Sequence, residues 1–170
     1  NCIVITTDNE QLDDPTNIDL AVIIVAHESV HQRIRELLEE SHGRSDSGQT
    51  LRSALAEGFA VFIEFKVIDL YIEILQNQGL TDRDEALSRH KQKRLEDIQD
   101  ETKNWNQAYS DGYLKIIPQI LKKYEPKEFP DIIKRIDFDK CYSTHPKDEA
   151  YQNSLSDISK IPMKDPSYQL

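Results

Sequence analysis

Cysteine is scarce in this chain: among 170 residues only Cys2 and Cys141 carry a thiol. The two lie far apart and form no CxxC pair, so the sequence does not indicate a cysteine-rich metal site. A single disulfide between them is compatible with the sequence. So small a number of cysteines nevertheless favours two free thiols.

Long hydrophobic runs and an excess of basic residues are also lacking. The longest apolar run, residues 20–26, is about a third of the roughly 18 residues needed to cross a bilayer, so we expect no membrane span. Lysine and arginine number 21 against 31 aspartates and glutamates, a net charge of −10. Such a chain is not expected to bind nucleic acid or anionic lipid. The basic run at 89–94 is flanked by acidic residues and predicts a solvated helix face.

The chain begins with neither a Met nor a signal peptide. We therefore expect a trimmed or processed product, cytoplasmic or secreted. The length suits one domain. We expect that domain to cover residues 1–145, with an irregular tail over 146–170.

Hydrophobic periodicity predicts a mainly α fold of the α+β class. The β-branched residues at 2–6 indicate one short strand, and the polar, glycine-containing stretch at 41–50 indicates a loop. The expected helices cover approximately residues 15–40, 51–78, 81–103, 105–124 and 129–136.

Local signals define where these helices begin, end and bend. Pro15 suits a helix start, Gly79 a C-cap, and Thr81 the N-cap of the next helix. Residues 18–26 are apolar almost all round, which predicts that this half of the first helix is buried. Pro118 predicts a kink inside the fourth helix.

One motif carries chemistry: His27, Glu28 and His31 form the pattern HExxH. Four residues along an α-helix correspond to about 400° of rotation and roughly 6 Å of rise, so both imidazoles lie on one face, one turn apart. They can share one metal ion. Glu28 is offset by about 100° and reaches the edge of the same site.

A catalytic zinc site needs a third protein ligand. The continuation typical of metzincins would place Gly and His where this chain has Ile34 and Leu37, which excludes that class. His42 or Asp46, in the following loop, can fold back towards the histidines.

Glu57 is the favoured third ligand, because it lies on the next helix, 26 residues after the second histidine, in an apolar environment. The adjacent Gly58 lowers helix stability but allows another element to approach closely. Glu64 is the reserve ligand, or else a partner that orients a ligand histidine.

HExxH followed some twenty-odd residues later by Glu on the next helix resembles the gluzincin metallopeptidases, the thermolysin-like group. The segment Glu-Gly-Phe-Ala at 57–60 resembles that of predicted bacterial zinc proteases in this group. The segment at 109–113 is similar to their downstream Tyr-x-x-Gly-Tyr helix. The Ser-Thr-His-Pro segment at 143–146 is similar to a loop of the gluzincins that process prenylated proteins.

The resemblance implies a zincin-like core with an active-site helix, a third-ligand helix and a small or truncated sheet. It implies one zinc ion on His27, His31 and Glu57. A water activated by that ion, with Glu28 as the general base, would hydrolyse a protein or peptide substrate. The candidate donors to the oxyanion are His145, Tyr113 and Tyr109.

The alternative is a non-catalytic helical domain that binds proteins and holds a structural metal ion or none. A structural site would usually fill its fourth position with Cys or His. Neither is present at a convincing spacing, so the sequence favours an open, catalytic position.

Overall fold

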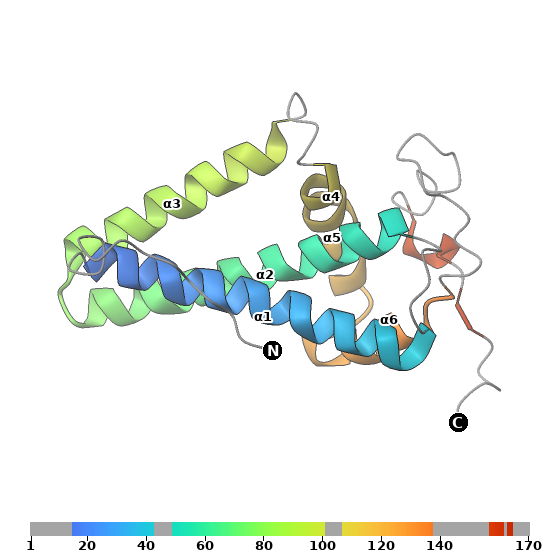
Figure 1. Cartoon of the computed structure of the whole chain (residues 1–170). Coiled ribbons are helices and arrows are strands. Elements are labelled where there is room, and N and C mark those ends of the chain that lie inside the picture. Colours follow the sequence, from blue (N-terminus) through green and yellow to red (C-terminus); the bar gives the residue numbers. More distant parts are fainter. Residues whose placement is uncertain (1–14, 43–48, 101–106, 138–156, 162, 165–170) are drawn as a thin grey trace.

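Two long antiparallel helices, α1 (Pro15–His42) and α2 (Gln49–Asn77), form the frame of the molecule (Figure 1). The structure is a computed structural model that describes residues 15–42, 49–100, 107–137, 157–161 and 163–164. A third helix, α3 (Thr81–Gln99), folds back and packs on both α2 and α1. The metal-binding motif predicted from the sequence lies midway along α1.

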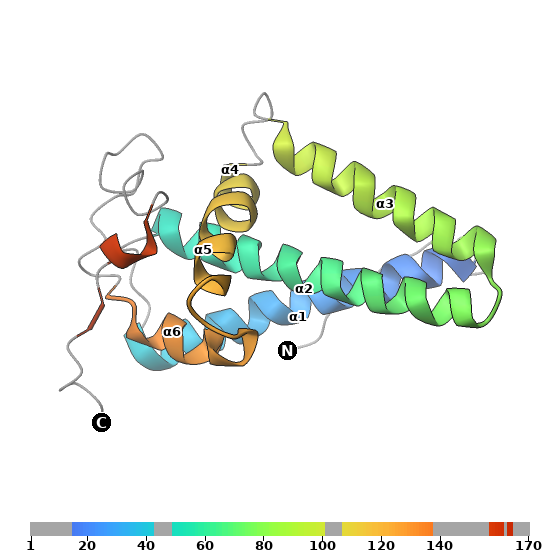
Figure 2. The ribbon, with the colours of Figure 1, turned by 180° about the vertical axis from the view of Figure 1, so that it is seen from behind.

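A second helical segment crosses α2 on the side away from α1 (Figure 2). It consists of α4 (Gln107–Tyr109), the π-helix η3 (Ser110–Ile116) and α5 (Ile117–Leu121). The chain then continues through the 3₁₀ turn η4 (Pro126–Glu128) into α6 (Phe129–Arg135), which packs against α1. A last 3₁₀ turn, η6, spans Ile158–Lys160.

The mainly α prediction is confirmed, since 87% of the described residues are helical. These residues contain no strand, only an isolated antiparallel bridge between Ile136 and Met163. The strand predicted at 2–6 lies outside the described residues. None of the described helices is both long and apolar enough to span a membrane.

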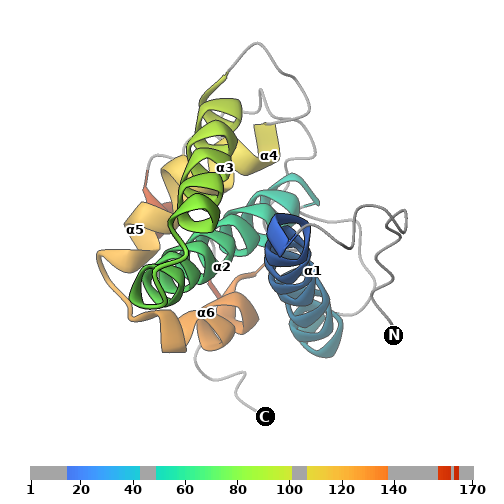
Figure 3. The same ribbon diagram turned by 90° about the vertical axis from the view of Figure 1, so that its left-hand side faces the viewer.

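Buried side chains form two clusters, one towards each end of the α1–α2 pair, which is viewed along its length in Figure 3. One cluster joins the second half of α1 to the first half of α2, η3, α5 and α6. Ile161, in the predicted irregular tail, is 2% exposed and belongs to this cluster. The other joins Ile23 of α1 to the second half of α2 and to α3.

The prediction that the first half of α1 is buried on all sides is wrong. Asp19, Ile23 and His27, spaced four residues apart, are buried. Because α2 and α3 cover only that side, the described residues leave the opposite side to solvent. The exposed apolar residues there are Ile18, Val22, Ile24 and Val25.

The end of α2 follows its sequence signal, whereas α3 ends at Gln99, before the predicted 103, and α1 and α2 each extend into the loop predicted at 41–50. Gly79 has a φ of +72° and ends α2 as predicted, with Leu80 N–H donating to Leu75 O at 3.0 Å. Thr81 was expected to cap α3 but is its first helical residue. Leu80 takes the cap position, and no side chain caps the helix.

The predicted fourth helix is a π-helix over much of its length. Residues 110–116 have this conformation, and Ile117 N–H donates to Gly112 O, five residues back. Pro118 stands in the first turn of α5, immediately after the π-helix. Because proline lacks an N–H, it cannot donate the usual helical hydrogen bond. The kink predicted at Pro118 takes the form of a widened turn that begins before the proline.

Candidate metal centre

Three side chains with metal-binding atoms converge between α1 and α2. One ligand atom from each of His27, His31 and Glu57 lies within 4.8 Å of the others. The two Nε2 atoms are 3.0 Å apart. Glu57 Oε2 lies 3.7 Å from Nε2 of His27 and 3.3 Å from Nε2 of His31. The structure thus brings together the three ligands that the sequence predicts.

The spacing of these atoms fits a metal ion. With metal–ligand bonds of about 2.0–2.2 Å and tetrahedral angles, ligand atoms lie about 3.3–3.6 Å apart. Of the three observed separations, 3.3 Å lies within that range, 3.0 Å lies just below it and 3.7 Å lies just above it. Glu57 Oε2 is also buried and has no hydrogen-bond partner among the described residues. Such an atom is costly to bury alone, and a cation between the three donors would satisfy it.

Helix periodicity explains why the donors meet. His27 and His31 are one turn apart on the side of α1 that faces α2. Because α2 runs antiparallel to α1, Glu57 stands opposite the motif, and Glu64 lies two turns further along the same face of α2.

Glu64 orients one of the histidines. Its Oε2 accepts a hydrogen bond from Nδ1 of His27 at 2.8 Å, and its side chain is only 6% exposed. In the neutral imidazole this bond leaves the lone pair on Nε2, which faces the other two donors. Of the two predicted roles for Glu64, the structure shows the orienting one.

Burial and charge act in opposite directions on the pKa values of these groups. Burial alone would lower the pKa of His27, but its contacts with Glu57 and Glu64 prevail and raise it to about 9. Burial alone would raise the pKa of Glu57, but its contacts with His27 and His31 lower it to about 2. Without a metal ion, neutral pH therefore leaves a protonated His27 beside an ionised Glu57.

A contact between two glycines brings a further residue to the site. A Cβ on Gly58 would lie 2.6 Å from the carbonyl carbon of Gly112, and a Cβ on Gly112 would lie 1.9 Å from the oxygen of Ala54. Backbone therefore touches backbone where η3 crosses α2. The prediction that Gly58 permits a close approach is confirmed. The approaching element, η3, directly follows α4, whose last residue is Tyr109.

Tyr109 adjoins the donors. Its ring stacks near that of His27, with 6.3 Å between the centroids. Burial and the charge of Glu57 raise the pKa of Tyr109, so the hydroxyl stays protonated at neutral pH, and its contact with Glu57 helps to lower the pKa of that carboxyl. Tyr109 is the one predicted oxyanion donor that the structure shows beside the metal-binding residues.

Arg94 completes the surroundings of the site, although the basic run at 89–94, to which it belongs, was predicted to form a solvated helix face. Its guanidinium lies 4.6 Å from the centroid of the Tyr109 ring, and Nε is 3.7 Å from Oε1 of Glu64. A positive charge thus stands behind the carboxylate that orients His27. The missed signal is helical spacing, because Arg94 lies on the stripe of α3 that contains the buried Leu87 and Ile98.

The other predicted residues make no hydrogen bond or ion pair with the three donors among the described residues or lie outside the described part of the chain. Glu28 is exposed and makes no hydrogen bond or ion pair with the described residues. Tyr113 packs edge-on against Phe65, with 5.1 Å between the centroids, and lines a separate pocket. His145 and the alternative ligand Asp46 lie outside the described residues. His42 is the last residue of α1.

Comparison with known proteins adds no relative. The chain matched no family model, and comparisons with curated proteins and with solved structures also returned no match.

Proposed function

We propose that this chain is a zinc-dependent peptidase of the gluzincin type. The observation that supports the proposal best is the convergence of His27, His31 and Glu57 on one point between two helices. Two imidazoles and one carboxylate are one of the ligand sets of catalytic zinc sites, which leave a fourth position open. A zinc ion held there would lower the pKa of a coordinated water towards 7 and polarise the carbonyl of a peptide bond.

The residues around the donors fit hydrolysis. Glu28 is one residue from a donor, is exposed and makes no hydrogen bond or ion pair with the described residues, so it is available to take a proton from the attacking water and deliver it to the leaving amine. Tyr109 keeps its proton and can donate a hydrogen bond to the oxygen that becomes negative. Glu64 holds the imidazole of His27 in the tautomer that binds a metal.

Two substitutions separate catalysis from metal binding. We expect Glu28→Gln to bind zinc like the unaltered protein and to lose about 10²–10⁴-fold in peptide hydrolysis, the usual contribution of a general base. His31→Ala should lose both zinc and activity. Zinc content is measured by elemental analysis, and hydrolysis by mass spectrometry of a mixed peptide library.

Glu73→Gln is the matched control, because Glu73 is an exposed carboxylate on α2 remote from the donors. It should change neither quantity. Full turnover by Glu28→Gln would exclude the general-base role. A zinc-loaded protein that cleaves nothing in the library would favour the alternative, a helical domain with a structural ion.

A further inference from the structure

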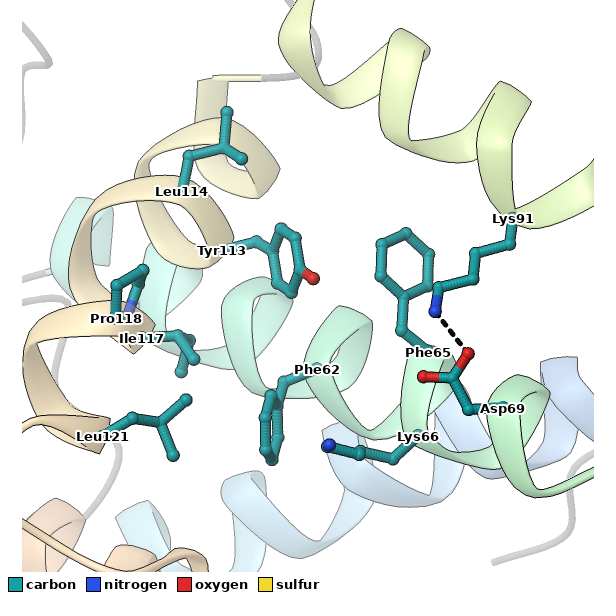
Figure 4. Close-up of a pocket in the computed structure, with 10 residues that line it drawn as sticks. All are labelled: Phe62, Phe65, Lys66, Asp69, Lys91, Tyr113, Leu114, Ile117, Pro118 and Leu121. Carbon is teal, nitrogen blue, oxygen red and sulfur yellow. Dashed lines mark hydrogen bonds and ion pairs between the residues drawn. The ribbon is translucent and has the colours of Figure 1, made fainter. Parts of the chain in front are cut away.

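A hollow separate from the candidate metal centre lies between α2, α3 and the segment formed by η3 and α5 (Figure 4). It has a volume of about 340 Å³, and none of the three metal-binding residues lines it. Most of its wall is apolar. The apolar and aromatic lining residues are Phe62, Phe65, Tyr113, Leu114, Ile117, Pro118 and Leu121.

Three polar side chains border the hollow on one side, and two of them are basic. Lys91 pairs with Asp69, and its ammonium also lies 5.5 Å from the centre of the Phe65 ring. Lys66 lies 5.8 Å from the centre of the Phe62 ring and pairs with no carboxylate among the described residues. Figure 4 shows the Lys66 side chain extending along the pocket towards Phe62.

The hydroxyl of Tyr113 is a further polar group at the hollow. Tyr113 makes no hydrogen bond with the described residues, and its oxygen is directed into the hollow (Figure 4). Burial and the charge of Asp69 raise the pKa of Tyr113, so the hydroxyl stays protonated. An apolar pocket with a few polar groups turned towards its interior is typical of small-molecule sites.

The charge at the hollow is opposite to that of the molecule. Two lysines and one aspartate line it, which leaves an excess of one positive charge, while the chain as a whole carries −10. The uncompensated charge belongs to Lys66. Lys66 lies beside apolar surface, so an anion attached to an apolar group would find both a charge and an apolar wall there.

We propose that this hollow binds a medium-chain aliphatic carboxylate, with the alkyl chain against Phe62, Leu114 and Ile117 and the carboxylate at Lys66. Size supports this ligand class. At about 30 Å³ for a water-sized group, a hollow of 340 Å³ accommodates about eleven such groups. This number is close to the count of non-hydrogen atoms in octanoate, roughly ten.

Titration calorimetry of the full chain with octanoate tests the proposal. A parallel titration with 1-octanol gives the binding of the uncharged analogue. We expect saturable one-to-one binding of octanoate and weaker binding of octanol. Lys66→Gln should weaken octanoate binding about fivefold, as expected for a partly exposed ion pair, and leave octanol binding unchanged. Leu114→Trp should fill the hollow and abolish binding of both.

The control is Lys93→Gln, which removes the same charge from an exposed position on α3 that does not line the hollow. It should bind octanoate normally. His31→Ala should do so too, which separates this proposal from that of the metal centre. Circular dichroism shows whether Leu114→Trp folds, and Lys66→Gln alters only an exposed side chain. Absence of saturable binding, or equal binding by the unaltered protein and Lys66→Gln, would overturn the proposal.

Discussion

His27 is the residue at which metal binding and pH are linked. Its pKa of about 9 exceeds the ordinary 6.5, so the charged imidazole stabilises the metal-free fold. This contribution is fully present below pH 6.5 and is lost as the pH rises through about 9. A metal ion needs the neutral imidazole, so it must displace a proton that the two carboxylates hold in place.

Zinc binding at pH 7 should therefore release about one proton from His27. Calorimetric titrations in two buffers with different ionisation enthalpies give this number directly. Between pH 8.5 and 7 the apparent affinity should fall roughly twentyfold, because the neutral fraction of His27 falls by about that factor. An affinity that does not change over this range would contradict ligation by His27.

Glu64→Gln tests the carboxylate behind that imidazole. The amide can still accept the hydrogen bond from Nδ1, so the substitution chiefly removes charge. Above pH 9, where His27 is already neutral, we expect the zinc affinity to fall at least about tenfold, as for other partners of ligand histidines. Proton release at pH 7 should also decrease, since His27 loses one of the two groups that raise its pKa. Glu73→Gln again serves as the control, and equal behaviour of the two variants would exclude the orienting role.

At the scale of secondary-structure elements, the crossing of η3 over α2 depends on the absence of two side chains. Gly112 and Gly58 permit direct backbone contact, and η3 takes the wider π conformation at this point. The crossing places Tyr109 beside the metal-binding residues. The geometry around the donors is thus controlled partly by residues that bind nothing.

Gly112→Ala should destabilise the fold by at least about 3 kcal/mol, because its Cβ would overlap backbone rather than a flexible side chain. Gly79→Ala is the matched control: it has open space but a positive φ, and should cost about 1–2 kcal/mol. Urea unfolding gives both values. Equal losses in the free energy of unfolding of the two variants would show that η3 and α2 move apart at their crossing at little cost.

Periodicity within the sequence predicts those features that depend on one helix at a time. The shared face of His27 and His31 and the end of α2 at Gly79 are of this kind. The π-helix and the position of Arg94 depend on how α2 packs against its neighbours, which local patterns do not encode. The exposed side of α1 escaped prediction for the same reason, since composition indicates burial but does not show which neighbours are present.

At the scale of the whole molecule, metal binding should be visible as stability. The three donors join α1 to α2, and a ligand of the folded state at a hundred times its dissociation constant stabilises that state by about 2.7 kcal/mol. For a chain of this size, the melting temperature should rise by about 5–10 °C with zinc.

A chelator should reverse this shift, and His31→Ala should show none. Differential scanning calorimetry with and without zinc makes the comparison. The same rise in His31→Ala would place the ion elsewhere, for instance among the many acidic residues of the surface.

The three donors all come from one helical hairpin, whereas Arg94 and Tyr109 come from elements added after it along the chain. Under the proposed function, capture of the ion and adjustment of its chemistry would therefore fall to separate parts of the polypeptide. Sequence changes in the later part could then alter reactivity while the hairpin kept its three donors, which would give this architecture room to diversify without losing its centre.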